Sequence, residues 1–212
     1  MLNQMLRRVC LWLLPLVILG CSESKLSGDP VEKIDDSSNI YAFEQGWNKD
    51  TQLKTYHISF GSRLFPYSWM LHLEQADNSE ELLSDSHMES LGFLIGVENQ
   101  YNPNKLPIGF TKDIDEDGLA WMGLGCAACH TGELRFAGKR FRVDGGPGLI
   151  DFSSFEAAVL DAMEATINDQ SKFQRFAVRA AAVGIQADAM KTEMQRQYSV
   201  VKARQQTNYT PV

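Results

Sequence analysis

The sequence has few residues that hold metals, with only four cysteines and four histidines among 212 residues. Two cysteines stand near the N-terminus, and Cys126 and Cys129 stand together in the middle. No second C-x-x-C pair and no paired histidines accompany them, which excludes the usual four-ligand structural zinc site. No strand–helix–strand pattern surrounds them either, which argues against a thioredoxin-like redox centre.

Basic stretches are missing beyond the first ten residues. The chain has 20 Lys and Arg against 27 Asp and Glu, which gives a formal net charge of −7. A nucleic-acid interface needs a basic patch or stripe, so nucleic acid is excluded as a partner. Hydrophobic residues make up 44% of the chain, which fits a globular domain and excludes an intrinsically disordered chain.

A long apolar run is also missing. The longest, LWLLPLVILG at 11–20, follows Arg7 and Arg8, and no acidic residue precedes it. A membrane-spanning helix needs about 20 apolar residues, whereas the core of a signal peptide needs about 7–15. We therefore predict a signal peptide over residues 1–20.

The run ends in Ile18-Leu19-Gly20-Cys21, which resembles the lipobox of bacterial lipoproteins. That resemblance implies lipidation at Cys21 and a lipid-anchored protein of the bacterial cell envelope, facing the periplasm or the outer surface. An ordinary signal peptide or membrane anchor that contains Cys21 by chance is the alternative. The residues after Cys21 are polar and rich in Ser and Asp, so we predict a flexible tether over 21–40.

Helical spacing dominates the remaining chain, which we predict to be one domain over residues 41–212. We expect a loop over 99–118 and a short β-hairpin over 134–148. A capping box with Ser153 at the N-cap and Glu156 three residues later opens another helix. The fold class that we predict is mainly α, a cytochrome c-like domain with a small β-hairpin. Helices are expected at 62–75, 79–96, 153–167, 169–183 and 186–205.

The middle of the chain carries C-x-x-C-H as Cys126-Ala127-Ala128-Cys129-His130. This spacing is the attachment signature of c-type haem. Two thiols three residues apart on a helical turn reach one edge of a porphyrin and form thioethers with its vinyl groups. The following imidazole then ligates the iron. We predict that Cys126, Cys129 and His130 bind haem c, with His130 as the iron ligand.

Two questions stay open at this stage. A plain Cys126–Cys129 disulfide is the alternative use of the pair in an oxidising compartment. The sixth iron ligand is also undecided between several methionines and the histidines His57, His72 and His87. A strong sixth ligand gives an electron carrier, whereas an open position admits oxygen or peroxide.

Basic residues follow the motif closely. Lys139, Arg140 and Arg142 stand on the predicted hairpin. Pairing with haem propionates and a solvated hairpin face are equally compatible with this pattern.

Several sequence blocks resemble the rubber oxygenase family of di-haem c-type cytochromes, which is distantly similar to bacterial di-haem cytochrome c peroxidases. The resemblance covers about residues 41–180. It implies that Cys126, Cys129 and His130 hold the first, reactive haem, whose other face is open or carries oxygen, and that a second haem serves electron transfer. The blocks are EQGW, FGSRLFPYSWMLHLE, LPIGFTKD, WMGLGCAACHTGELRFAGKRFRVDGGPG and KFQRFAVR.

The chain departs from this family because it has no second C-x-x-C-H and is much shorter than the family's members. We therefore expect the N-terminal haem portion only, a truncated domain that binds one haem for electron transfer or haem-iron redox chemistry. Oxygenase or peroxidase activity is an expectation for a complete protein. The expected partners are a redox partner protein or the missing second haem domain, and the membrane through the lipid.

Overall fold

The computed structural model describes residues 31–34, 39–180 and 187–209. The predicted signal peptide and the predicted lipidation at Cys21 lie outside these residues. Part of the predicted tether is ordered, because Val31 to Lys33 form a strand that pairs with the strand beginning at Ile40.

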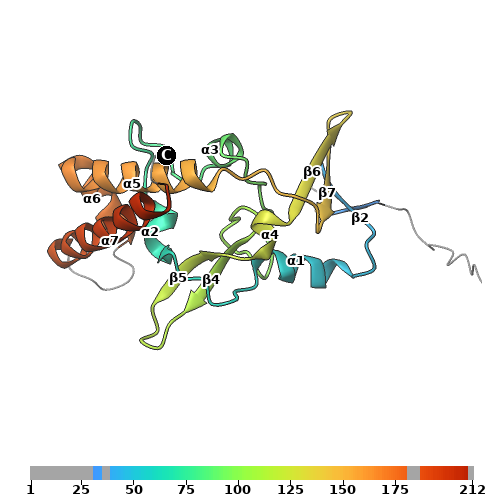
Figure 1. The fold of residues 1–212 in the computed structure, drawn as a ribbon, viewed down its shortest axis with the longest axis horizontal. Coiled ribbons are helices and arrows are strands. Elements are labelled where there is room, and N and C mark those ends of the chain that lie inside the picture. The colour runs from blue at the N-terminus through green and yellow to red at the C-terminus, as the bar shows by residue number, and fades with distance from the viewer. Residues whose placement is uncertain (1–30, 35–38, 181–186, 210–212) are drawn as a thin grey trace, which may run out of the picture. The chain divides into compact units, whose positions relative to one another are not determined.

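One sheet has four strands in the order β1-β2-β7-β6 (Figure 1). Strands β6 and β7 form the hairpin that the sequence predicts, and β2 joins β7 in parallel. The parallel pair brings Tyr41 beside Phe141, residues far apart in the chain. The bounds are β1 (Val31–Lys33), β2 (Ile40–Phe43), β6 (Thr131–Phe136) and β7 (Lys139–Asp144).

A second sheet has three strands in the order β3-β5-β4, all antiparallel. Strand β4 lies inside the segment 99–118, which was expected to be a loop. The turn that follows it is held by Asp115, whose carboxylate accepts hydrogen bonds from the backbone N–H of Asp117 and Leu119. The bounds are β3 (Phe65–Pro66), β4 (Phe110–Ile114) and β5 (Ala120–Leu124).

The helices fall into two groups. Near the C-terminus α5, α6 and α7 lie close to the predicted ranges, and α5 packs against both of the others. The expected helices at 62–75 and 79–96 are only six residues each in the structure. The bounds are α1 (Lys49–His57), α2 (Tyr67–His72), α3 (Asp85–Ser90), α4 (Cys126–Cys129), α5 (Phe152–Asn168), α6 (Gln170–Ala180) and α7 (Ala187–Asn208).

The fold class predicted from the sequence is wrong. Of the described residues 44% are helical and 21% are in strands, so the fold is α/β rather than mainly α. Two of the strands that were not predicted, β1 and β3, have only three and two residues, too few to show a period of two. Pairing between distant segments, as in β2 and β7, leaves no local pattern at all.

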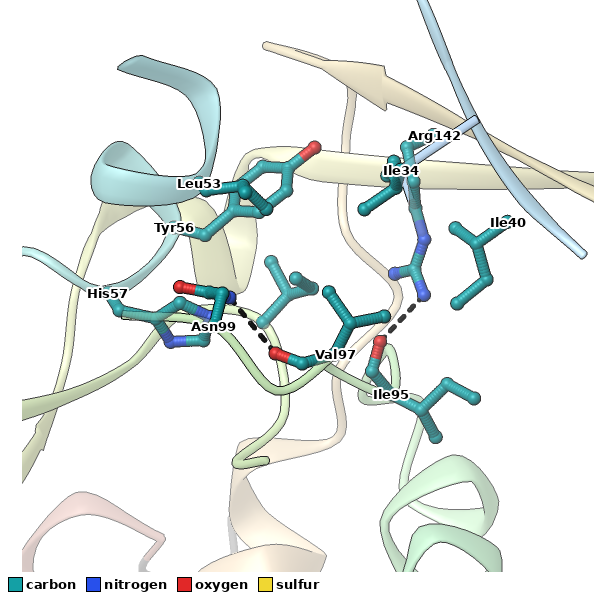
Figure 2. A pocket seen from close by; sticks show the side chains of 10 residues that line it. Ile34, Ile40, Leu53, Tyr56, His57, Ile95, Val97, Asn99 and Arg142 are labelled. Atoms are coloured by element: carbon teal, nitrogen blue, oxygen red, sulfur yellow. Dashed lines mark hydrogen bonds between the residues drawn. The ribbon is translucent and has the colours of Figure 1, made fainter. Parts of the chain in front are cut away.

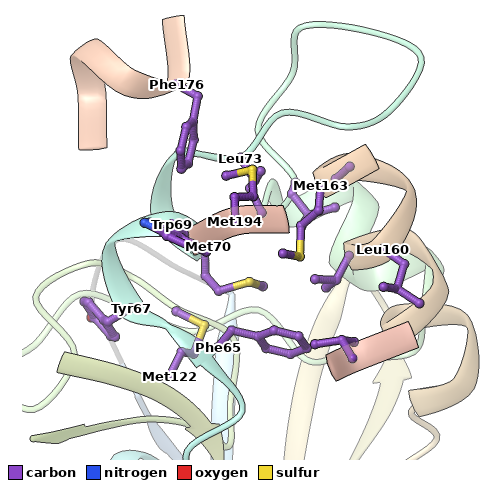
Figure 3. Close-up of a cluster of buried hydrophobic side chains, with 14 of the residues drawn as sticks. Phe65, Tyr67, Trp69, Met70, Leu73, Met122, Leu160, Met163, Phe176 and Met194 are labelled. Atoms are coloured by element: carbon purple, nitrogen blue, oxygen red, sulfur yellow. The ribbon is translucent and has the colours of Figure 1, made fainter. Parts of the chain in front are cut away.

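The main hydrophobic core lies where α2 and the second sheet meet the C-terminal helices (Figure 3). Aromatic rings meet edge to face, as Trp69 does with Phe176 and Phe65 with Phe155. Each fully buried large apolar side chain contributes about 1.5–3 kcal/mol to folding. The residues labelled in Figure 3 are Phe65, Tyr67, Trp69, Met70, Leu73, Met122, Leu160, Met163, Phe176 and Met194.

Candidate functional site

The C-x-x-C-H motif forms a single closed turn, α4, directly after strand β5. The backbone N–H of His130 donates to the carbonyl of Cys126 over 2.9 Å, and the N–H of Ala128 donates to Gly125 over 3.2 Å. Gly125 itself is tied to β4, because its N–H donates to the carbonyl of Gly109 over 2.8 Å. The turn is thus fixed to the second sheet by its own backbone.

This turn has one buried side and one exposed side. Ala127 and Ala128 are only 7% and 4% exposed, whereas Cys126, Cys129 and His130 are exposed. Neither cysteine forms a disulfide. The structure therefore brings together all three residues that the sequence singled out, on the solvent side of one turn.

Two glycines allow backbone to close onto the alanine side. Gly109 has φ +87°, and a Cβ there would lie 2.1 Å from the backbone nitrogen of Ala128. A Cβ at Gly148 would lie 2.7 Å from the carbonyl oxygen of Ala128. Real contacts of a Cβ are never that short, so only glycine fits at either position. The C-x-x-C-H pattern does not predict that glycine is needed at positions 109 and 148.

The loop after β7 also forms hydrogen bonds with the C-terminal end of the motif. The N–H of Gly145 donates to the carbonyl of His130 over 2.8 Å, and the N–H of Gly148 donates to that of Cys129 over 2.7 Å. Both residues belong to the GGPG stretch that follows the hairpin. These bonds use the carbonyls at the end of α4, and no residue that the structure describes forms a hydrogen bond with the two thiols or the imidazole.

Behind the motif lies a buried tyrosine that sequence analysis did not find. The backbone carbonyl of Tyr56 accepts a hydrogen bond from the N–H of Gly109, and its hydroxyl donates to Asp144 over 2.7 Å. Burial, with the negative charge of Asp144, raises the pKa of Tyr56, so the hydroxyl remains a donor. Tyr56 therefore links helix α1 both to the glycine beneath α4 and to the end of β7.

His57 was one candidate for the sixth iron ligand, and it faces the interior. Its Nδ1 lies 3.0 Å from the carbonyl oxygen of Phe110, and its ring is 8% exposed. The ring borders a cavity of about 10 Å³ that it shares with Tyr56, Asn99 and Arg142 (Figure 2). Burial lowers the pKa of His57, so the imidazole is neutral at pH 7. The thiols of Cys126 and Cys129, by contrast, are exposed to solvent.

The other candidates for the sixth ligand have contacts elsewhere. His72 ends α2 near Arg179, and His87 places its Nδ1 2.7 Å from the carbonyl oxygen of Leu82. In the part of the chain that the structure describes, no hydrogen bond joins either histidine to His130. The described methionines are all buried in the main core. They are Met70, Met88, Met122, Met163, Met190 and Met194.

Two of the three basic residues after the motif, Arg140 and Arg142, pair with acidic side chains. Arg142 is 1% exposed, and its Nε lies 3.1 Å from Glu133, while its Nη2 donates to the carbonyl of Ile95 over 2.8 Å. Burial lowers the pKa of Arg142 to about 10, so it stays charged at pH 7. Arg140 pairs with Glu133 and Glu89. A solvated face therefore does not describe Arg142, and pairing with propionates stays a prediction.

The donor set of the site fits a covalently held haem. Two unpaired thiols and an imidazole share one exposed side of a turn whose backbone is fixed, as thioether attachment with an axial histidine requires. Within residues 31–34, 39–180 and 187–209, no group of three or more His, Cys, Asp or Glu is placed to hold a metal ion by itself. Nor does any helix in those ranges have the length and apolar character to cross a membrane.

Comparison with known proteins gives one informative likeness. Over 166 residues the chain is 31% identical to "Uncharacterized protein y4iJ" of Sinorhizobium fredii (strain NBRC 101917 / NGR234), an alignment that covers 68% of the chain. The chain spans about a quarter of that relative, because the alignment covers 27% of its length. No protein-family model matches the chain, and no solved structure matches it.

Proposed function

We propose that the chain binds one haem c through Cys126 and Cys129, with His130 as an iron ligand, and serves electron transfer or haem-iron redox chemistry. One observation carries this proposal. Turn α4 buries its two alanines and exposes its two thiols and its imidazole. A structural disulfide would not need the histidine, whereas haem attachment uses all three exposed side chains.

The bound haem would supply a one-electron iron couple, whose potential depends on the axial ligands and on burial. The chain's own residues do the positioning. Cys126 and Cys129 fix the group to a turn that cannot shift, since Gly109 and Gly148 lock its far side. The backbone bonds at His130 hold the residue that carries the imidazole.

Three wider proposals rest on resemblance. The chain corresponds to the first haem portion of a di-haem oxygenase or peroxidase of the rubber oxygenase type. Its oxidoreductase activity, if that portion acts within a longer protein, depends on a second haem or a redox partner. Lipidation at Cys21 would place it in the bacterial cell envelope, which agrees with the attachment of covalent haem outside the cytoplasm.

The proposal is tested by exporting the full chain in a bacterium that makes c-type cytochromes and measuring covalent haem by the pyridine haemochrome assay. We expect one haem per wild-type chain. Cys126→Ala and Cys129→Ala are expected to lose most stably attached haem. His130→Ala is expected to lose the native visible spectrum because the axial bond is gone.

Cys10→Ala is the control, because it removes a thiol in the predicted signal peptide and leaves the motif intact. It should carry as much haem as wild type. Full covalent haem in Cys126→Ala would show that the site is assigned wrongly. Wild type without haem but with oxidised thiols would favour the disulfide.

A further inference from the structure

A hollow of about 510 Å³ adjoins the motif, within the range of about 300–1,000 Å³ that small-molecule and cofactor sites occupy. Its walls are strand β6, which ends the order of the first sheet among the described strands, the segment 92–94 and the loop 146–149. Thr131, which lines it, follows His130 directly. The lining of the hollow therefore begins one residue after His130, the proposed iron ligand.

The walls of the hollow are fixed to each other and to the motif. A Cβ at Gly92 would lie 2.0 Å from the carbonyl oxygen of Leu149, so these two segments pack backbone against backbone. The N–H of Asp151 donates to the carbonyl of Leu91 over 2.8 Å. Together with the bond from Gly148 to Cys129, these contacts hold the loop 146–149 between the motif and segment 92–94.

The lining has an apolar part and a charged part. The charged part is an ion-pair cluster, in which Arg135 lies 2.9 Å from Glu133 and 2.7 Å from Glu89. The apolar part includes Leu134 and Leu149, which are 60% and 85% exposed. Exposed leucines are unremarkable singly, but here two border one hollow whose lining begins at Thr131, the residue after His130. The apolar lining residues are Phe93, Leu94, Leu134, Val143, Pro147 and Leu149.

We propose that this hollow receives the porphyrin of the haem attached at Cys126 and Cys129, with Leu134 and Leu149 packed against the ring. The ligand that fits is a large apolar ring, because apolar residues make up about half of the lining and the one cation, Arg135, is already paired with Glu133 and Glu89. The proposal rests on the proposed function and adds the residues that seat the ring. It predicts that both leucines become buried when haem is bound.

The test compares Leu149→Asp with Val178→Asp in the haem-loaded protein. Val178 lies on α6, is 80% exposed and does not line the hollow, so it matches Leu149 in exposure alone. Leu134→Asp and Ile114→Asp form a second pair on strands, at 60% and 53% exposed. The readouts are the melting temperature and the visible absorption spectrum, with covalent haem measured in every sample.

We expect Leu149→Asp and Leu134→Asp to lower the melting temperature of the haem-loaded protein by about 5 °C or more and to shift the haem absorption, because a carboxylate replaces an apolar contact with the ring. Val178→Asp and Ile114→Asp should change neither. Equal changes in melting temperature and absorption in both members of each pair, with haem attached throughout, would show that the hollow does not receive the porphyrin. That result would leave the proposed function unaffected. A wild type without covalent haem would instead overturn the proposed function and this inference with it.

Discussion

At the scale of single residues, the site depends on Gly109, which lies outside the C-x-x-C-H motif and could not be predicted from it. Gly109 and Gly46 have nearly the same backbone, with φ +87° and +86°, but a Cβ at Gly46 meets nothing within 4 Å. Gly46→Ala should therefore cost only the left-handed conformation, about 1–2 kcal/mol. Gly109→Ala adds a clash with the backbone of Ala128 and should destabilise the protein well beyond Gly46→Ala.

The measurement is urea unfolding of both variants, together with their covalent haem content. We expect Gly109→Ala to lose most of its haem, since the turn that presents Cys126 and Cys129 cannot keep its position. Equal free energies of unfolding for the two variants would contradict the close packing of Gly109 on α4.

The residues that sequence reasoning found are those whose chemistry needs a fixed local spacing. Cys126, Cys129 and His130 stand within five consecutive positions, so their spacing could be read directly. Tyr56 and Gly109 could not be found in this way, because each supports α4 from a distant segment. A buried supporting residue has no spacing to recognise, and only the folded backbone shows it.

At the scale of elements, the start of α5 separates the predicted cap from the observed one. The sequence indicated Ser153, but the N-cap is Asp151, whose carboxylate accepts from the N–H of Ser154 over 2.9 Å and from its hydroxyl over 2.7 Å. Asp and Ser are both favoured N-caps, so composition alone did not decide between them. The helix consequently begins at Phe152.

Asp151→Ala should lower the free energy of unfolding by about 1 kcal/mol, because an N–H at the helix start loses its acceptor. Ser153→Ala should be nearly neutral, since position 153 is already inside the helix, where alanine is well tolerated. Denaturant unfolding of the two variants measures the difference. A larger loss for Ser153→Ala than for Asp151→Ala would restore the cap predicted from the sequence.

Helix α6 is joined to the end of α2 by one buried acid. Glu74 has a side chain that is 4% exposed; it pairs with Arg175 over 2.6 Å and also with Arg179. Hydrogen bonds from Arg175, and then from Arg179, lower the pKa of Glu74 to about 2. The KFQRFAVR block thus supplies two buried phenylalanines, Phe173 and Phe176, on one face of α6 and these arginines on another.

Because the pKa of Glu74 is lower in the folded protein than its ordinary value of 4.5, its contribution to stability is complete above about pH 5. It is lost as the pH falls towards 2. Glu74→Gln should cost about 1–3 kcal/mol at pH 7, and its deficit against wild type should shrink between pH 5 and 2. Thermal unfolding across this range is the measurement.

Glu193→Gln is the matched control, since Glu193 and Arg196 form an exposed pair on α7, with side chains 39% and 60% exposed. Exposed pairs contribute at most about 1 kcal/mol, so this variant should unfold almost as wild type does. Curves for wild type and Glu74→Gln that stay parallel down to pH 2 would contradict the pairing.

Some helices and strands could be predicted from the sequence and others could not, for a physical reason. Helices α5, α6 and α7 were predicted because their apolar positions repeat locally over many residues. The β6–β7 hairpin was predicted because its two strands are adjacent in sequence. Strands β1 and β3 were missed because they are very short, and β2 because it meets β7 only after the chain has folded. Strand β4, with its partner β5, was missed because the prolines and polar residues of 99–118 indicated a loop.

At the scale of the whole molecule, the described chain has one large hydrophobic core and two small ones, and Tyr56, Ile108 and Ala127 form one of the small ones. The large core joins the C-terminal helices to α2 and the second sheet, whereas Ile34, Ile40 and Ala42 form a small core under the first sheet. Turn α4 is bonded to the second sheet through Gly109 and to the end of the first sheet through Gly145. The motif therefore stands where both sheets meet, on backbone that both sheets hold.

The central claim is that the exposed side of α4 carries haem, and one peptide tests it most directly. Trypsin cleaves after Lys112 and Arg135, so residues 113–135 of the exported protein form a peptide that contains both thiols and His130. The account predicts that this peptide carries the added mass and the visible absorption of one haem, with no free thiol. A peptide with two unmodified thiols, or one lacking two hydrogens as a Cys126–Cys129 disulfide, would contradict it.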